Sequence, residues 1–273
     1  MKPHSGLRRL RWRWNDALGH IIPPVLTLVF GVMVWYALIW LFQFREYILP
    51  TPHVVLRTIY EKRQTLLAHS FHTLFEAVAG FLAAIAFGVP CAMAIVGSRA
   101  LDRSITPILV FSQTFPKAAI APLLVIWFGF GYIPKIVVAF LVAYFPVVIA
   151  LVVGMRAAEN ELVELVQSMK ASTLQMFFKV RMPCSLPFFF SGLKTAAAFA
   201  LVGAVVGEWV GADKGLGFLL VIANADLNTR LTFAVLILLM LYGFLWFSLV
   251  ALVERMCIPW HVSVRKEELG ATL

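Results

Sequence analysis

Long apolar runs separated by short polar segments dominate the chain. Each run is long enough to cross the ~30 Å hydrocarbon core of a bilayer as a helix of about 20 residues. Four runs contain no Lys, Arg, Asp or Glu: residues 21–44, 77–97, 136–155 and 231–253. Two further runs, 105–130 and 186–210, contain embedded charges. The pattern therefore predicts an all-α polytopic membrane protein with six transmembrane helices.

The composition and the placement of charge extend this prediction. The chain is 61% hydrophobic, with a mean hydropathy of +0.88 and a net charge of +9. With six spans that start inside, 15 Lys and Arg residues fall on the inner side and seven on the outer side. This bias predicts two cytoplasmic termini. It divides the chain into a basic N-terminus (1–20), a six-span domain (21–253) and a C-terminal tail (254–273).

Two other signals are weighed and set aside. The basic run "RRLRWRW" near the N-terminus is typical of a membrane anchor with interfacial tryptophans, so we expect no nucleic-acid partner. The three cysteines have no paired spacing, which argues against a disulfide framework or a metal site.

One polar segment, 156–187, interrupts the apolar pattern on the predicted cytoplasmic side. The "KAST" stretch ends a first amphipathic helix, and Ser172 or Thr173 suits the N-cap of a second, short helix. We expect Pro183 and Pro187 to end that second helix before the fifth span. Such a corner either docks into the groove of a partner protein or lies on the lipid surface.

The same segment resembles a cytoplasmic loop in the permease subunits of bacterial ATP-binding-cassette importers. That loop contains Glu-Ala-Ala, three residues, Gly, nine residues and then Ile-x-Leu-Pro. Glu164, Lys170 and Pro183 stand at the spacing of its Glu, Gly and Pro, whereas the two Ala and the Gly are replaced. The stretches "SQTFPKAAIAPLLVIWFGFG", "GEWVGADKGLGFL" and "PWH" are similar to the branch that serves nitrate, sulfonates, taurine and pyrimidine precursors.

The resemblance implies a type I importer permease fold with a cytoplasmic coupling helix. It also implies a second permease copy, most simply as a homodimer, two cytoplasmic ATPase subunits and a periplasmic solute-binding protein. ATP and Mg²⁺ would bind to the ATPase chains, with no cofactor on this chain, and the bilayer would be the bacterial inner membrane. The residues expected to couple to the ATPase are Glu161, Glu164, Lys170, Ser172, Leu174, Phe177, Phe178 and Pro183.

Lys170 stands where the resembling family has glycine. Glycine suits a helix C-terminus because it reaches the left-handed conformation without a Cβ penalty. A lysine held in that conformation costs roughly 1 kcal/mol. Either the corner is built differently, or Lys170 offsets the cost by contacting helix-end carbonyls or an acidic patch on the ATPase. We favour the first alternative.

Three charged residues are candidates for the translocation pathway: Lys117, Glu76 and Glu208. Lys117 follows Arg103 by 14 residues, or ~21 Å along a continuous helix, which places it deep in the bilayer. An intramembrane lysine indicates a functional site unless it neutralises a structural carboxylate. Glu208 should face protein near the outer boundary while Lys194 extends toward the cytoplasm. The sequence does not choose whether Lys117 pairs with Glu76 or with Glu208.

The cargo and the class of transporter remain open at this point. A lysine in the pathway favours an anion such as a sulfonate or nitrate, and a pyrimidine-type cargo is equally compatible with the resemblance. The alternative class is a self-contained proton-coupled secondary transporter that uses the same three charges. Such a carrier has no need of a docking segment, and six spans without an inverted repeat are few for one. No catalytic motif is found, so we expect a transport subunit that is not an enzyme.

Overall fold

The computed structural model describes residues 6–158, 164, 166 and 168–259, with the backbone alone for 6–21, 173 and 174. In these ranges the chain is helical, without strands. The elements are α1 (Gly6–Phe42), α2 (Pro52–Glu61), α3 (Arg63–Gly97), α4 (Arg99–Thr114), η1 (Lys117–Ile120), α5 (Ala121–Phe128), α6 (Tyr132–Arg156), α8 (Thr173–Met176), η2 (Phe177–Arg181), α9 (Met182–Glu208), α10 (Leu216–Ala225) and α11 (Thr229–Cys257).

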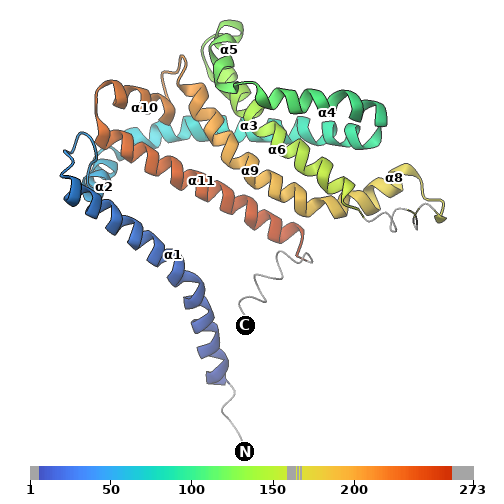
Figure 1. Cartoon of the computed structure of the whole chain (residues 1–273), viewed down its shortest axis with the longest axis horizontal. Coiled ribbons are helices and arrows are strands. Elements are labelled where there is room, and N and C mark those ends of the chain that lie inside the picture. The colour runs from blue at the N-terminus through green and yellow to red at the C-terminus, as the bar shows by residue number, and fades with distance from the viewer. Residues whose placement is uncertain (1–5, 159–163, 165, 167, 260–273) are drawn as a thin grey trace, which may run out of the picture.

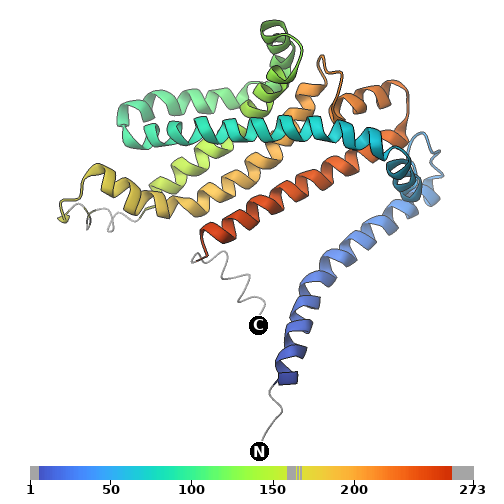
Figure 2. The ribbon, with the colours of Figure 1, turned by 180° about the vertical axis from the view of Figure 1, so that it is seen from behind.

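Helices α3, α6, α9 and α11 form the central bundle, and α4 runs back along α3 (Figures 1 and 2). Small residues let the backbones of these helices approach closely. A Cβ added at Gly80 would stand 2.5 Å from the Ala139 Cβ, and one at Gly203 would stand 2.7 Å from the Ala139 Cα. Neither position has room for a side chain, because α3 and α9 both pack closely against α6 at this point.

The apolar helices fit the predicted number of spans. Five helices are long and apolar enough to cross a membrane, and the bent pair formed by α4 with η1 and α5 passes the same test when it is taken as one span. The second span starts earlier than its apolar run predicts, because α3 already begins at Arg63. The apolar part of α1 is unlike the others: none of its most apolar window is buried in the chain (Figure 1). Its contacts include one between the rings of Trp35 and Phe233.

The third apolar run, which contains Pro107, Pro116 and Pro122, is broken at the second of these prolines. The α4 axis and the axis of η1 and α5 differ by 85°. Pro116 has no N–H to donate, and the residue before a proline avoids the helical region. Phe115 accordingly adopts an extended conformation, with φ −73° and ψ 127°. The ~21 Å expected for Lys117 was measured along a continuous helix, whereas the helix ends at Thr114 and the chain turns before Lys117.

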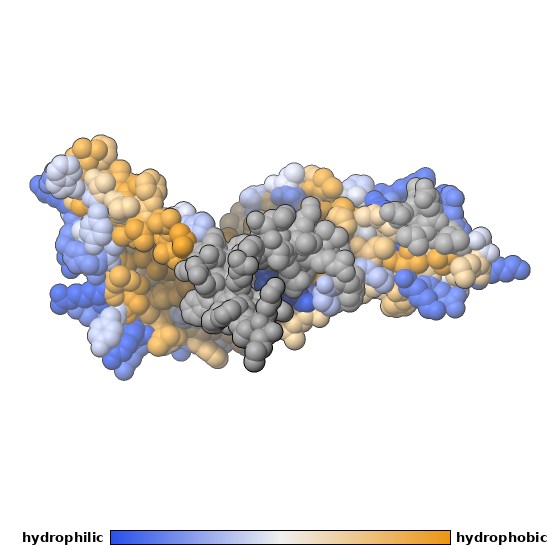
Figure 3. Space-filling view, turned by 90° about the horizontal axis from the view of Figure 1, so that it is seen from below, coloured by the Kyte–Doolittle hydropathy of each residue, from blue (hydrophilic) through white to orange (hydrophobic). Residues whose placement is uncertain are grey.

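The two ends of the bundle carry different short elements. Figures 1 and 2 show α2 and α10 at one end and α8 at the opposite end. The helix α2 follows the Pro-x-Pro turn at residues 50–52, and α10 lies in the connection between the last two spans. Figure 3 shows hydrophilic residues gathered at both ends of the long axis, with hydrophobic surface mainly between them. This distribution is that of a protein whose middle faces lipid.

Candidate functional site

The corner that precedes α8 turns at Lys170, which has a left-handed backbone with φ 57°. The Ala171 N–H donates to the Val166 carbonyl at 3.3 Å. This bond links the second residue after a helix end to the third from last, as in the Schellman motif, and Lys170 occupies the position that glycine usually takes. Our preference for a differently built corner is wrong. The lysine keeps the glycine geometry and carries its cost of roughly 1 kcal/mol.

The next helix begins with a capping box at Ser172. The Gln175 N–H donates to the Ser172 hydroxyl at 3.2 Å, and the Gln175 side-chain oxygen accepts from the Ser172 N–H at 2.9 Å. Each side chain thereby satisfies a backbone donor that the start of a helix leaves free. The predicted N-cap at Ser172 is confirmed, so the turn at Lys170 and the start of α8 are both determined locally.

The predicted stop at Pro183 and Pro187 is wrong, because the helix continues into the fifth span. η2 is a π turn between α8 and α9, in which the Met182 N–H donates to the Phe177 carbonyl. In this turn each backbone N–H donates to the carbonyl five residues before it, where an α-helix uses the carbonyl four residues before. The turn ends just before Pro183, which has no backbone N–H to donate. A movement of α8 therefore reaches α9 through continuous helix.

The polar segment 156–187, which resembles the coupling loop and which we call the coupling segment, contains two neighbouring phenylalanines that point to different surroundings. Phe177 packs against the cluster of buried residues that includes Ile95 and Met155, at the ends of α3 and α6. Phe178 is 57% exposed, and Met169 before the corner is 74% exposed. These two residues, which we call the apolar corner surface, are the described hydrophobic side chains of the segment that face outward.

The other predicted coupling residues are placed only in part. Glu164 is exposed, and Pro183 lies in the first turn of α9. Only the backbone of Leu174 is described, as part of α8. Glu161 lies outside the described residues, together with most of the first amphipathic face. The assignment of all these residues to ATPase coupling stays a prediction.

Lys117 lies at the break of the third span and lines a cavity of about 510 Å³ between α4, η1 and α6. Its walls are mostly aromatic and aliphatic. The lining residues are Ile108, Leu109, Phe111, Ser112, Phe115, Lys117, Ile120, Phe140, Leu141, Tyr144 and Phe145. Lys117 is the one ionisable side chain with a charge at neutral pH among them. It is half-buried and forms no ion pair with the described residues.

Glu76 and Glu208 lie elsewhere, in a buried polar cluster near the end of the bundle that carries α10. Glu76 is 0% exposed and Glu208 is 1% exposed. The partner of Glu76 is Lys135 on α6, whose Nζ stands 3.0 Å from the Glu76 Oε1. An ion pair of Lys117 with either glutamate, left open by the sequence, is therefore not formed. The cation paired with the buried Glu76 is Lys135, which is itself 4% exposed.

Glu208 and Thr73 attach α10 to the bundle. The Glu208 carboxylate accepts from the Thr73 hydroxyl at 2.7 Å and from the Gly217 N–H at 2.5 Å. The Leu216 N–H donates to the Thr73 hydroxyl oxygen at 2.8 Å. These bonds satisfy N–H groups at the start of α10, which helix geometry leaves without partners. The expectation that Glu208 faces protein is confirmed.

Gly215 makes this attachment possible. Its φ of 122° is a conformation that side chains rarely adopt, and an added Cβ would stand 2.1 Å from the Glu208 Oε1. The Gly215 N–H donates to the Nδ1 of His69 on α3 at 2.9 Å. The start of α10 is thus held by α3 and by α9.

Lys194, which we expected to extend toward the cytoplasm, forms an ion pair with Glu254. Its Nζ stands 2.7 Å from the Glu254 Oε2, and it also lies over the ring of Phe247 at 5.8 Å from the centroid. Both partners belong to α11. The ion pair therefore joins α9 to α11 near the end of the bundle that carries α8.

Sequence reasoning gave no role to Lys135, Thr73 or Glu254 and did not predict the contact of His69 with Gly215. Lys135 and Glu254 each lie one position outside an apolar run and were counted as flanking charges. Thr73 precedes Glu76 by three residues, and His69 precedes Thr73 by four, so one helix face carries all three. This spacing of three polar residues on one helix face is the signal in the sequence that could have predicted the buried polar cluster.

Comparison with known proteins identifies the family. Residues 84–257 match the family described as binding-protein-dependent transport system inner membrane component. A probable ABC transporter permease protein of Haemophilus influenzae is 39% identical, over 86% of this chain and 96% of that protein. The riboflavin transport permease RibX of Chloroflexus aurantiacus is 34% identical, over 94% of both chains. The formylaminopyrimidine transport permease ThiX of Halalkalibacterium halodurans is 32% identical, over 80% of this chain and 87% of that one.

Solved structures agree on the fold. The inward-facing MetNI methionine ABC transporter superimposes with a TM-score of 0.65 over 72% of this chain and 97% of that one, at 18% identity. Relatives at 29% and 28% identity are named for aliphatic sulfonates and taurine.

The chain belongs to the binding-protein-dependent permeases of ABC importers. It is a multi-pass membrane protein that acts as a transport subunit, and the resemblance found in the sequence is confirmed. The alternative of a self-contained secondary transporter is not supported by this family.

Proposed function

We propose that two copies of this chain line the pathway of an ATP-driven importer in a bacterial inner membrane, with both termini in the cytoplasm. A separate ATPase, which holds the ATP and Mg²⁺, docks on the corner around α8 of each copy. A periplasmic binding protein delivers the cargo to the opposite end, where α2 and α10 lie. Support for the docking comes from Met169 and Phe178, two large hydrophobic side chains exposed beside Lys170 and Lys179.

The cavity at Lys117 carries our proposal for the cargo. A cavity of about 510 Å³ is of the size that holds small organic ligands. Five of its lining residues are aromatic: Phe111, Phe115, Phe140, Tyr144 and Phe145. Aromatic walls favour a flat ring by stacking, whereas a small hydrated anion would lose its water against them without replacement. One lysine suits a ring that carries electron-rich nitrogen or carbonyl groups.

We therefore propose a pyrimidine-type heterocycle as the cargo, ahead of nitrate or a sulfonate. The names of the formylaminopyrimidine and riboflavin permeases describe ring compounds and point the same way. The names of the sulfonate and taurine permeases belong to relatives of lower identity. In this account Lys117 contacts cargo, while Glu76 and Glu208 hold the bundle together.

Uptake of a labelled aminopyrimidine by the assembled importer tests this proposal. We expect Lys117→Met to lower kcat/KM for uptake roughly tenfold, because one charged contact with the cargo is lost. Lys62→Met is the matched control, since it makes the same change at an exposed lysine outside the cavity.

Two results would contradict the proposal. Normal uptake by the Lys117→Met importer would remove Lys117 from the pathway. Selective uptake of taurine with no uptake of the pyrimidine would overturn the cargo, while leaving the ATP-driven mechanism in place.

A further inference from the structure

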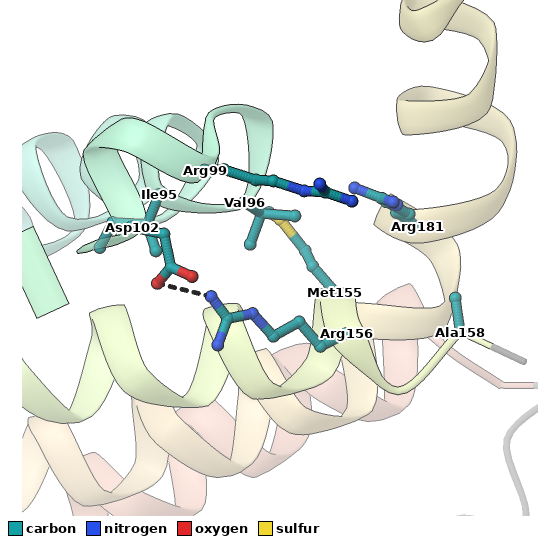
Figure 4. A pocket seen from close by; sticks show the side chains of 8 residues that line it. All are labelled: Ile95, Val96, Arg99, Asp102, Met155, Arg156, Ala158 and Arg181. Atoms are coloured by element: carbon teal, nitrogen blue, oxygen red, sulfur yellow. Dashed lines mark ion pairs between the residues drawn. The ribbon is translucent and has the colours of Figure 1, made fainter. Parts of the chain in front are cut away.

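Three arginines converge on a second cavity, at the corner of the bundle next to the coupling segment. Figure 4 shows this cavity, of about 320 Å³, which we call the arginine pocket. Its lining residues are Ile95, Val96, Arg99, Asp102, Met155, Arg156, Ala158 and Arg181. Arg99 belongs to the first turn of α4, Arg156 ends α6, and Arg181 ends η2. Three elements distant in the sequence therefore supply the same kind of side chain to one place.

Among the residues that the structure describes, the charges in the arginine pocket do not balance. Asp102 pairs with Arg156 at 2.7 Å between Oδ1 and a guanidinium nitrogen. Arg99 and Arg181 form no ion pair with the residues that the structure describes. Figure 4 shows their side chains extending toward each other from opposite sides of the pocket. Two guanidinium groups that face each other repel unless an anion lies between them, and each can grip an oxyanion with paired N–H donors.

The floor of the arginine pocket is apolar. The apolar side chains in the lining are Ile95, Val96, Met155 and Ala158, and the half-buried Val96 offers the most surface to a ligand. A ligand that fits needs an anionic head for the arginines and a hydrophobic part for the floor. Inorganic phosphate offers only the first of these properties, whereas a phospholipid offers both.

The level of the arginine pocket in the bundle also favours a lipid. The spans α3 and α6 end at Gly97 and Arg156, so the pocket lies at the end of the bundle where two spans leave the apolar middle of the molecule. Basic pockets between transmembrane helices at this level recognise anionic headgroups.

We propose that the arginine pocket binds the phosphate-bearing headgroup of an anionic phospholipid. Arg99 and Arg181 clamp the phosphate, and the glycerol and upper acyl chain lie against the apolar floor. Because Arg181 belongs to η2 and Arg99 to α4, the bound lipid joins the coupling segment to the broken third span.

Lipid binding to the purified full-length chain, without any ATPase, tests this proposal. Native mass spectrometry would measure the first binding of phosphatidylglycerol and of phosphatidylcholine with identical acyl chains. We expect a preference of roughly tenfold or more for phosphatidylglycerol, since each basic side chain near the headgroups contributes measurably. The double variant Arg99→Gln with Arg181→Gln should lose most of this preference.

Two further variants make the result specific. Arg103→Gln with Lys179→Gln removes the same charge from the same two elements outside the pocket, and should keep the preference. Arg99→Lys with Arg181→Lys keeps the charge without the forked donors, and should keep part of it. Because the preference is a ratio within each variant, a lower yield of folded protein does not alter it.

The proposal is overturned by any of three outcomes. The first is equal binding of the two lipids to the wild-type chain. This result would mean that the arginines bind an acidic group of this chain or of a partner protein. The second is an equal loss in the pocket variant and in the Arg103 and Lys179 control. The third is displacement of phosphatidylglycerol by millimolar inorganic phosphate, which would make the pocket a site for free anions.

Discussion

Lys170 is the residue at which local strain and a candidate function meet. Its left-handed conformation (φ 57°) is held by the hydrogen bond from Ala171 to Val166 around it. Neither bond partner needs the lysine side chain, which is exposed. Among the described residues no contact of this side chain offsets the strain, and strain of this kind is often found at functional positions.

Lys170→Gly should stabilise the isolated chain by about 1 kcal/mol, because glycine adopts the same φ without the Cβ penalty. Thermal unfolding in detergent would measure the gain. Lys179→Gly, at an exposed position inside η2, is the control and should destabilise by a similar amount. A loss of stability in Lys170→Gly would mean that the lysine side chain itself holds the corner.

Single residues were predicted unevenly from the sequence. The cap at Ser172 was predictable because both of its partners lie within four residues. The partner of Glu76 was not, because Lys135 comes from another helix and its distance depends on how α3 and α6 pack. Pairing among buried charges is a tertiary property, and the pattern along the chain identifies only the groups that need partners.

At the scale of elements, α10 depends on a few polar contacts for its position. Thr73 donates to Glu208 and accepts from the Leu216 N–H, so one hydroxyl bridges α3, α9 and α10. Both contacts are buried, and a buried donor without a partner costs about 1–3 kcal/mol.

Thr73→Val should therefore release α10 while leaving the bundle folded. We expect hydrogen exchange of the α10 amides to become roughly tenfold faster or more, with little change in α6 and α9. Thr195→Val is the control, because its exposed hydroxyl donates only to Ser191 of the same helix. Unchanged protection of α10 would show that its apolar contacts with Leu66 and Val235 hold it without the polar cluster.

The elements themselves were predictable where apolar length decided them and less so at prolines. Six runs gave six spans because length and hydropathy are sufficient evidence for a membrane helix. Pro116 breaks the third span by 85°, whereas Pro183 and Pro187 leave the fifth helix continuous. The difference lies in the backbone before each proline, extended at Phe115 and π-helical at 177–181, which the residue types do not specify.

At the scale of the whole molecule, the bundle separates two polar ends, with the coupling corner at one and α10 at the other (Figure 1). Between them the Lys117 cavity opens beside the broken third span. The bend in this span falls at Pro116, which has no backbone N–H to leave unpaired. The continuous helix from α8 into α9 offers a rigid link from the corner into the bundle. This arrangement suits a subunit that is moved by an ATPase at one end and loaded at the other.

The most direct test of the account is co-purification of the tagged chain from its native cells in mild detergent, with mass spectrometry of the partners. We predict a P-loop ATPase at about equal stoichiometry. The ATPase should be lost from Met169→Asp with Phe178→Asp, which places charge on the apolar corner surface, and kept by Leu227→Asp, a change at the 80% exposed Leu227 next to α10. Recovery of the chain alone, still active in proton-driven uptake, would contradict the account.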